Sequence, residues 1–343
     1  MLANENPLLD DPAPVAPVVA INDLASLCKA TGDPLRLEIL QVLRQDSLAV
    51  QELCAIFAIR QPAMSHHLKV LTAAGAVTSR REGNSIYYRR AVLGQQPGLD
   101  TVQSVLYAAI DQMTLTSSLQ QQLSSMQQAR ENTSQLFFRQ NADKFHAQQD
   151  LIASYEQYGE TVAEVLQDAP LQAHHLALEV GPGDGAFLTQ LAAQFEQVVA
   201  LDNAAEMLAK SEQLAAASNI ENIEFVHGDT RHPRLQNLAA DCIVVNMVLH
   251  HTPSPADIFQ DLASCLAKDG VLLVTDLCQH DQDWARENCG DLWLGFEPED
   301  LLSWAERAGL REIASVYLAQ RNGFQIQVRL FGHQLISNKE NEK

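Results

Sequence analysis

Three glycines at alternate positions, with a carboxylate ahead of them, form the segment of this chain best suited to chemistry. The apolar run 176–180 leads into Gly181, Gly183 and Gly185, and a helical pattern follows. A strand that turns through glycines into a helix presents backbone N–H groups to a ligand at the helix N-terminus. We therefore expect a nucleotide-like ligand to bind at this turn.

The Glu179 side chain distinguishes between two ligands of this kind. Gly181, Gly183 and Ala186 also satisfy the relaxed dinucleotide fingerprint, but a carboxylate two residues before the first glycine would repel a pyrophosphate. The same carboxylate attracts a cationic amino group or a sulfonium. The pattern Glu-x-Gly-x-Gly-x-Gly resembles the first motif of class I methyltransferases, which implies S-adenosylmethionine or its product S-adenosylhomocysteine as the ligand. An ordinary glycine-rich turn stays open as the alternative.

More polar side chains stand directly after other apolar runs. Asp202 ends the run 198–201 and lies 21 residues after Gly181, close to the ~20-residue spacing at which an acid bonds ribose hydroxyls. Open α/β sheets bind ligands beyond the carboxyl ends of their strands, so such residues should converge. The methyltransferase resemblance further implies that Asp229 accepts a hydrogen bond from the adenine amine. The predicted cofactor-binding residues are Glu179, Gly181, Gly183, Gly185, Asp202, Asn203, Met207, Asp229, Thr230 and Asn246.

Two adjacent histidines are the candidates for catalysis. His250 and His251 follow the apolar run 242–245 and are predicted to act as a base or to contact the substrate, with a purely structural role as the equal alternative. Asn246 is not followed by the Pro-Pro-aromatic motif of amino-group DNA methyltransferases, and the Pro-Cys nucleophile of cytosine enzymes is absent. Resemblance to UbiE-type methyltransferases implies a small-molecule or quinone-like methyl acceptor.

The elements that position these residues alternate between strands and helices. Runs at 176–180, 198–201, 225–227, 242–245 and 271–275 predict parallel strands, and 316–318 with 324–330 predicts a final antiparallel pair. We expect an α/β, Rossmann-like class I methyltransferase sheet with helices on both faces. It would occupy residues 136–335, including N-terminal cap helices. In the resembled family a helical segment before the first strand commonly caps the cofactor pocket, which makes Phe137, Phe138 and Phe145 candidates, although an aromatic stripe at this spacing is more often part of a core.

An earlier part of the chain has a different pattern. Asp33-Pro34 begins one helix, and a helix from Gln61 to Ala74 buries Met64 and Leu68 on one face. Two short strands with arginines follow. A helix-turn-helix plus a basic hairpin predicts a mostly α, winged helix-turn-helix domain over residues 21–95, although a small helical domain with a charged face is the alternative.

The runs Gly32-Asp33-Pro34-Leu35-Arg36 and Gln61 to Leu71 resemble the ArsR/SmtB family of repressors. The resemblance implies a homodimer that binds double-stranded DNA at a palindromic operator. In that family the helix at 101–113 pairs with its twin in the dimer, and packing of its apolar face against its own domain is the equal alternative. The segments Trp284-Ala285-Arg286-Glu287 and Asp291 to Phe296 resemble a stretch shared by ArsR-type regulators that are fused to methyltransferases. The resemblance to this group covers almost the whole chain. The predicted DNA-binding residues are Arg60, Gln61, Ser65, His66, Lys69, Arg80, Arg81 and Asn84.

No metal is expected. The arsenic-type site of the family uses a Cys-x-Cys pair, and here Cys54 is followed by Ala55 and Ile56. The zinc-type site uses histidines of the last helix, and residues 100–113 contain none. The six cysteines are scattered, which favours reduced thiols.

The distribution of charge differs between the two parts of the chain, as expected if they have different binding partners. The net charge is −20, yet residues 20–95 hold nine Lys/Arg and six Asp/Glu, a balance of +3. No apolar run approaches the ~20 residues of a membrane span and no secretory leader is evident, so a cytoplasmic protein without membrane partners is expected. Residues 1–20, with four prolines, are expected to form a disordered tail, and 96–135 dimerisation and connector helices.

Three hypotheses of function follow. In the first, an ArsR-type regulator carries a methyltransferase domain that methylates a small molecule. In the second, the methyltransferase-like domain senses S-adenosylmethionine or S-adenosylhomocysteine without turnover. In the third, the chain is a methyltransferase whose winged helix serves dimerisation.

Overall fold

A computed structural model describes residues 20–44, 46–82, 85–93, 97–141, 144 and 148–333. Contacts divide the chain into two compact units, Met1–Ser79 with Tyr88–Thr116, and Arg80–Tyr87 with Ser117–Lys343. The expected tail 1–20 lies outside the described residues except for Ala20, as do Asn84 and Phe145. Among the described residues, no helix combines the length and the apolar character that crossing a membrane requires.

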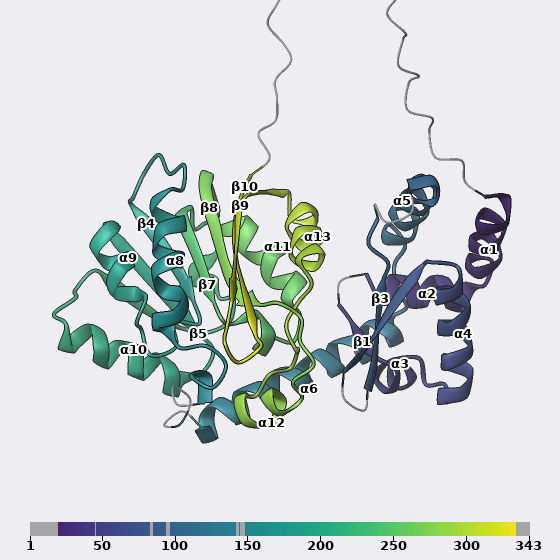
Figure 1. The fold of residues 1–343 in the computed structure, drawn as a ribbon, viewed down its shortest axis with the longest axis horizontal. Coiled ribbons are helices and arrows are strands. Elements are labelled where there is room, and N and C mark those ends of the chain that lie inside the picture. Colours follow the sequence, from purple (N-terminus) through teal and green to yellow (C-terminus); the bar gives the residue numbers. More distant parts are fainter. Residues whose placement is uncertain are drawn as a thin grey trace, which may run out of the picture. The chain divides into compact units, whose positions relative to one another are not determined.

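Short helices and a small sheet build the first unit (Figure 1). In chain order they are α1 (Ile21–Thr31), α2 (Pro34–Val42), β1 (Leu48–Ala49), α3 (Val50–Phe57), α4 (Gln61–Ala73), β2 (Val77–Glu82), β3 (Ser85–Arg90) and α5 (Pro97–Asp111). The three strands are ordered β1-β3-β2. The division by contacts groups Arg80–Tyr87, the tip of the hairpin β2–β3, with the second unit.

Local sequence explains the helix-turn-helix. Asp33 caps α2 by accepting a hydrogen bond from the Arg36 N–H at 3.2 Å, and Pro34 occupies the first turn. Ala58 adopts the left-handed conformation with φ of 52°, which ends α3 and starts the turn into α4. Helix α4 then buries Met64 and Leu68 completely, as its spacing predicts. The predicted winged helix-turn-helix is therefore confirmed.

The second unit is a doubly wound sheet. Its strands are β4 (Leu176–Val180), β5 (Gln197–Asp202), β6 (Ile223–His227), β7 (Ala240–Asn246), β8 (Leu266–Leu277), β9 (Leu310–Ala319) and β10 (Gln325–His333). Their order is β6-β5-β4-β7-β8-β10-β9, and β10 alone runs antiparallel to both neighbours. The last two strands are longer than predicted because their pairing extends to Leu310 and His333.

Helices cover both faces of this sheet (Figure 1). They are α6 (Ser117–Asn141), α8 (Tyr155–Gln167), α9 (Leu188–Gln194), α10 (Ala205–Ala217), α11 (Pro255–Cys265), α12 (Trp284–Cys289) and α13 (Pro298–Arg307). Leu178 packs in the cluster with α11 and α13, whereas the adjacent Ala177 packs in the cluster with α8 and α9. The alternation of side chains along β4 thus supplies both cores, and the predicted α/β architecture is confirmed.

Candidate functional site

The glycine turn after β4 has the backbone conformation that its residues predict. Gly181, Gly183 and Gly185 have φ of +65°, +60° and +89°, which L side chains rarely adopt. A Cβ on Gly181 would lie 2.5 Å from Val248 Cγ2, whereas a Cβ on Gly183 would meet nothing within 4 Å. Gly183 therefore faces open space, as a ligand cradle requires. Gly185 instead packs against α10, where a Cβ would lie 3.2 Å from Ser211 Cα.

Glu179 lies under this turn with 2% of its surface exposed. Its Oε2 has no hydrogen-bond partner among the described residues. Burial, together with the charge of Asp184, raises the pKa of Glu179 to about 8. A buried carboxyl with an unsatisfied oxygen suits a cationic group that arrives with the ligand.

The carboxyl ends of β5, β6 and β7 bring the other predicted side chains together. Asp202 accepts a hydrogen bond from the Ala204 N–H at 2.8 Å, and burial raises its pKa to about 6 although this bond and His227 lower it. Asp229 pairs with Arg231 at 3.1 Å. Both side-chain polar atoms of Asn246 are buried without a hydrogen-bond partner among the described residues. Parallel register places Asp202 beside His227, so the strand ends form one edge.

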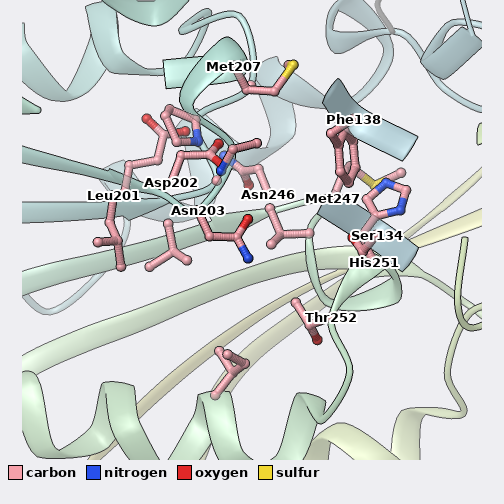
Figure 2. A pocket seen from close by; sticks show the side chains of 18 of the residues that line it. Ser134, Phe138, Leu201, Asp202, Asn203, Met207, Asn246, Met247, His251 and Thr252 are labelled. Atoms are coloured by element: carbon pink, nitrogen blue, oxygen red, sulfur yellow. The ribbon is translucent and has the colours of Figure 1, made fainter. Parts of the chain in front are cut away.

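A cavity of about 240 Å³ joins these residues. Every predicted cofactor residue except Gly185 lines it. In Figure 2, Asp202 and Asn203 lie on one side of the cavity, while His251 lies beside Phe138 and Ser134 on the other. The structure thus brings the separate sequence motifs into a single pocket.

Helices before the sheet form further walls of the cavity, and the sequence indicated only some of their residues. Ser134 and Phe138 come from α6, and Tyr155 and Tyr158 from α8. Phe138 packs on Met207 and makes an edge contact with His251, with ring centroids 4.9 Å apart. The aromatic stripe signalled Phe138 in advance, but Ser134 gave no signal because a serine in a Gln/Ser-rich helix is typical of a solvated face.

The two histidines differ in their access to the cavity. His251 lines it, whereas His250 is fully buried behind it and is not among its walls. His250 Nδ1 lies 2.7 Å from Asp276 Oδ1. Burial opposes the charge of His250, but Asp276 and Asp291 outweigh it and raise its pKa to about 9. Burial and the charge of His250 lower the pKa of His251 well below its ordinary value. Of the two, His251 is placed to touch an acceptor.

In the first unit, the predicted DNA-binding residues gather around α4. Arg60, Gln61, His66 and Lys69 are exposed, and Ser65 is half-buried. In the hairpin, Arg81 is exposed, whereas Arg80 pairs with Glu82 and burial lowers its pKa to about 10. Helix α4 therefore presents polar and cationic side chains on the face opposite its buried residues.

Comparison with known proteins assigns families to both parts. Residues 33–79 match the family of bacterial regulatory proteins called the arsR family, and residues 178–274 match a methyltransferase domain. The HTH-type transcriptional repressor SmtB of Mycobacterium tuberculosis is 40% identical over 79 residues, which are 23% of this chain and 58% of that protein. The arsenical resistance operon repressor of Staphylococcus xylosus is 37% identical over 71 residues, 21% of this chain and 68% of that protein.

A further relative is named for a different activity. The arsenite methyltransferase of Halobacterium salinarum is 27% identical over 121 residues, which are 35% of this chain and 28% of that protein. This chain therefore spans less than two thirds of the SmtB relative and under a third of the arsenite methyltransferase.

Proposed function

This chain belongs to the arsR family of bacterial regulatory proteins and carries a methyltransferase domain, and on that premise we propose that it is a DNA-binding regulator whose second unit methylates a small molecule. S-adenosylmethionine is the proposed methyl donor. The observation that carries the proposal is the single cavity that runs from the glycine turn and Glu179 to His251.

The residues of the cavity fit this donor. Gly183 leaves space that a Cβ would fill, and the orphaned Glu179 Oε2 is available to an ammonium group. The described residues that line the cavity include eight carboxylates, Glu131, Asp150, Glu179, Asp184, Asp202, Asp229, Asp257 and Asp261, against one arginine, Arg231. Such a wall favours a cationic ligand and disfavours a pyrophosphate. When bound, the donor supplies a sulfonium methyl group as the electrophile.

Several residues that line the cavity have distinct tasks in this mechanism. Glu179 binds the donor's amino group, Asp202 the ribose hydroxyls and Asp229 the adenine amine, while Met207 packs on the ring. Phe138 closes the wall between Met207 and His251 and keeps water from the methyl group. These contacts hold the donor in line with an acceptor, and positioning of this kind supplies most of the acceleration of a methyl transfer.

The acceptor is proposed to bind beside His251. This ring lines the cavity next to Phe138 and Thr252, and its lowered pKa keeps it neutral near pH 7. A neutral imidazole is able to orient or bind an acceptor oxygen or nitrogen. The buried His250 lies behind His251, on the side of the ring away from the cavity.

DNA binding is proposed for α4. Its exposed Gln61, His66 and Lys69 have the reach to contact base edges and phosphates, and the hairpin arginine Arg81 is exposed as well. The homodimer that a palindromic operator requires is proposed to form through α5. In and beside this helix, Val105 and Met113 expose apolar side chains.

Calorimetric titration of the full chain tests the proposal. We expect binding of S-adenosylmethionine and of S-adenosylhomocysteine, and a change of operator affinity when either is present, because coupling requires a differential affinity for two states. Absence of binding by either ligand would refute the methyl-donor site. Binding without any methylated product from a panel of acceptors would favour sensing over turnover. Occupancy that leaves operator affinity unchanged would favour an enzyme whose winged helix only dimerises.

A further inference from the structure

Behind the acceptor side of the cavity, two imidazoles and a carboxylate from separate segments form a buried cluster. His250 and His251 lie in the 3-10 turn Leu249–His251 after β7, and Asp291 follows α12. Asp291 Oδ1 lies 3.9 Å from His250 Nε2 and 3.7 Å from His251 Nδ1. One ligand atom from each of the three side chains lies within 4.8 Å of the others. Nitrogen and oxygen donors therefore lie close together. His251 Nδ1 also donates a hydrogen bond to Gly290 O at 3.3 Å, so the ring must release this contact or turn its buried Nε2 toward an ion in order to bind it.

Asp291 lacks the partners that a buried carboxylate requires. Asp291 has 3% of its surface exposed, and neither its Oδ1 nor its Oδ2 accepts a hydrogen bond from the described residues. The positive charge of Arg286 attracts Asp291, and the Arg286 guanidinium donates hydrogen bonds to Leu292 O and to Glu82. Burying a charged carboxylate without hydrogen bonds is strongly unfavourable. A cation bound at the cluster would remove this cost.

The ring of His250 is held in the orientation that a metal ligand needs. Asp276 Oδ1 lies 2.7 Å from His250 Nδ1 and also accepts a hydrogen bond from the Leu277 N–H at 2.7 Å. Fixing Nδ1 in this way leaves Nε2 directed at Asp291. Metal-binding histidines typically have their other ring nitrogen bonded to a carboxylate, which sets the tautomer and strengthens the ligand.

We propose that His250, His251 and Asp291 bind a divalent transition-metal ion of the Zn²⁺ type, with Asp276 orienting His250. Two imidazoles and one carboxylate form a ligand set that zinc accepts with a fourth position open. Ligand atoms around a tetrahedral zinc lie ~3.3 Å apart, given bonds of about 2.0–2.1 Å. The two distances to Asp291, 3.7 and 3.9 Å, exceed this value by a few tenths of an ångström. All three ligand atoms lie within 4.8 Å of one another, so binding requires side-chain shifts of at most about 1.5 Å.

The open position would face the cavity, because His251 forms part of its wall. An acceptor oxygen bound there would ionise more readily beside the metal, so the site would favour oxygen acceptors. This choice of acceptor rests on the proposed function, whereas metal binding itself does not. A proton on His250 shared between Asp276 and Asp291 is the competing arrangement, and it needs no ion.

Cobalt titration of the full chain separates the two. The chain is stripped with a chelator and titrated with Co²⁺, and the visible absorption of the bound ion reports its geometry and ligands. We expect one ion per chain, with d–d bands of a four- or five-coordinate N/O site and no thiolate charge-transfer band. Failure to bind near one equivalent, or a thiolate band from the free cysteines, would overturn the proposal.

Variants identify the ligands. Asp291→Asn, which is nearly isosteric, should weaken Co²⁺ binding at least ~100-fold, and Asp276→Asn about 10–100-fold as expected for a residue that orients a ligand. His175→Ala removes an exposed histidine beside Glu196 and should change nothing. If Asp291→Asn does not fold, His251→Gln replaces it. Equal affinity in wild type and ligand variants would refute the site.

The same samples separate this proposal from the proposed function. Titration with S-adenosylmethionine in the absence of metal reports the donor site alone. Loss of Co²⁺ binding with intact donor binding refutes only the metal site, and the reverse result refutes only the methyl-donor site.

Discussion

The buried carboxyl of Glu179 predicts that donor binding releases a proton. With a pKa of about 8, about nine tenths of the free protein carries a protonated Glu179 at pH 7. If the donor's ammonium binds the carboxylate form, Glu179 must lose this proton. About 0.9 proton should therefore leave per ligand bound at pH 7.

The affinity should then rise with pH. The deprotonated fraction of a group with a pKa of about 8 grows roughly 20-fold between pH 6 and 7.5, and the association constant should follow it. Above this window the ligand's own amino group, with a pKa of about 8, begins to lose its charge and the gain stops. The ligand-free protein should show the opposite trend. Because folding raises the pKa of Glu179 above its ordinary 4.5, the stability contributed by this group is lost as the pH rises toward 8.

Calorimetry in buffers of different ionisation enthalpy counts the released protons directly. Glu179→Gln keeps the shape of the side chain and should abolish both the release and the pH slope. Asp202 titrates in a similar range, with a pKa of about 6, so Asp202→Asn is the matched control and should keep most of the slope. A slope with S-adenosylmethionine but not with S-adenosylhomocysteine would assign the partner as the sulfonium. Proton release below about 0.2 per ligand at pH 7 would refute the reasoning.

Three further predictions concern the cradle, the DNA contact and the fold. Gly183→Ala should weaken donor binding because its Cβ enters the open cradle. Gly309→Ala, also at positive φ with open surroundings, should lower only the folding stability, by the ~1–2 kcal/mol of backbone strain. Equal donor affinity in both variants would contradict the cradle. Lys69→Ala on α4 should lower the salt slope of operator binding by about one, while Lys29→Ala on α1 leaves it unchanged, as gel-shift titrations at several salt concentrations would measure. Arg90→Ala should cost about 3 kcal/mol in denaturant unfolding, because its buried guanidinium donates to Leu40 O and Asp111; a loss below about 1 kcal/mol would contradict this.

The sequence was sufficient for the parts of the site that local rules determine. In a parallel sheet all carboxyl ends meet at one edge, so a polar residue directly after an apolar run has a predictable position. Asp202, Asp229 and Asn246 could be placed together on this ground, and Glu179 by its position before the glycine turn. All four line the same cavity. Likewise, a proline after a capping aspartate and a buried stripe at helical spacing were enough to predict the helix-turn-helix.

The side chains that surround the acceptor depend on packing between distant segments, which spacing does not encode. Asp291 stands 40 residues after His251, in a segment where nothing but the fold brings it within reach of the two histidines. The Cys-x-Cys and His spacings that identify metal sites in a sequence report ligands on one element, so they do not detect a cluster assembled from a turn and a loop. Asp276 shows the same limit from the other side. Its place at the end of a buried strand did not indicate which side chain it contacts, and only the fold brings its Oδ1 within 2.7 Å of His250 Nδ1.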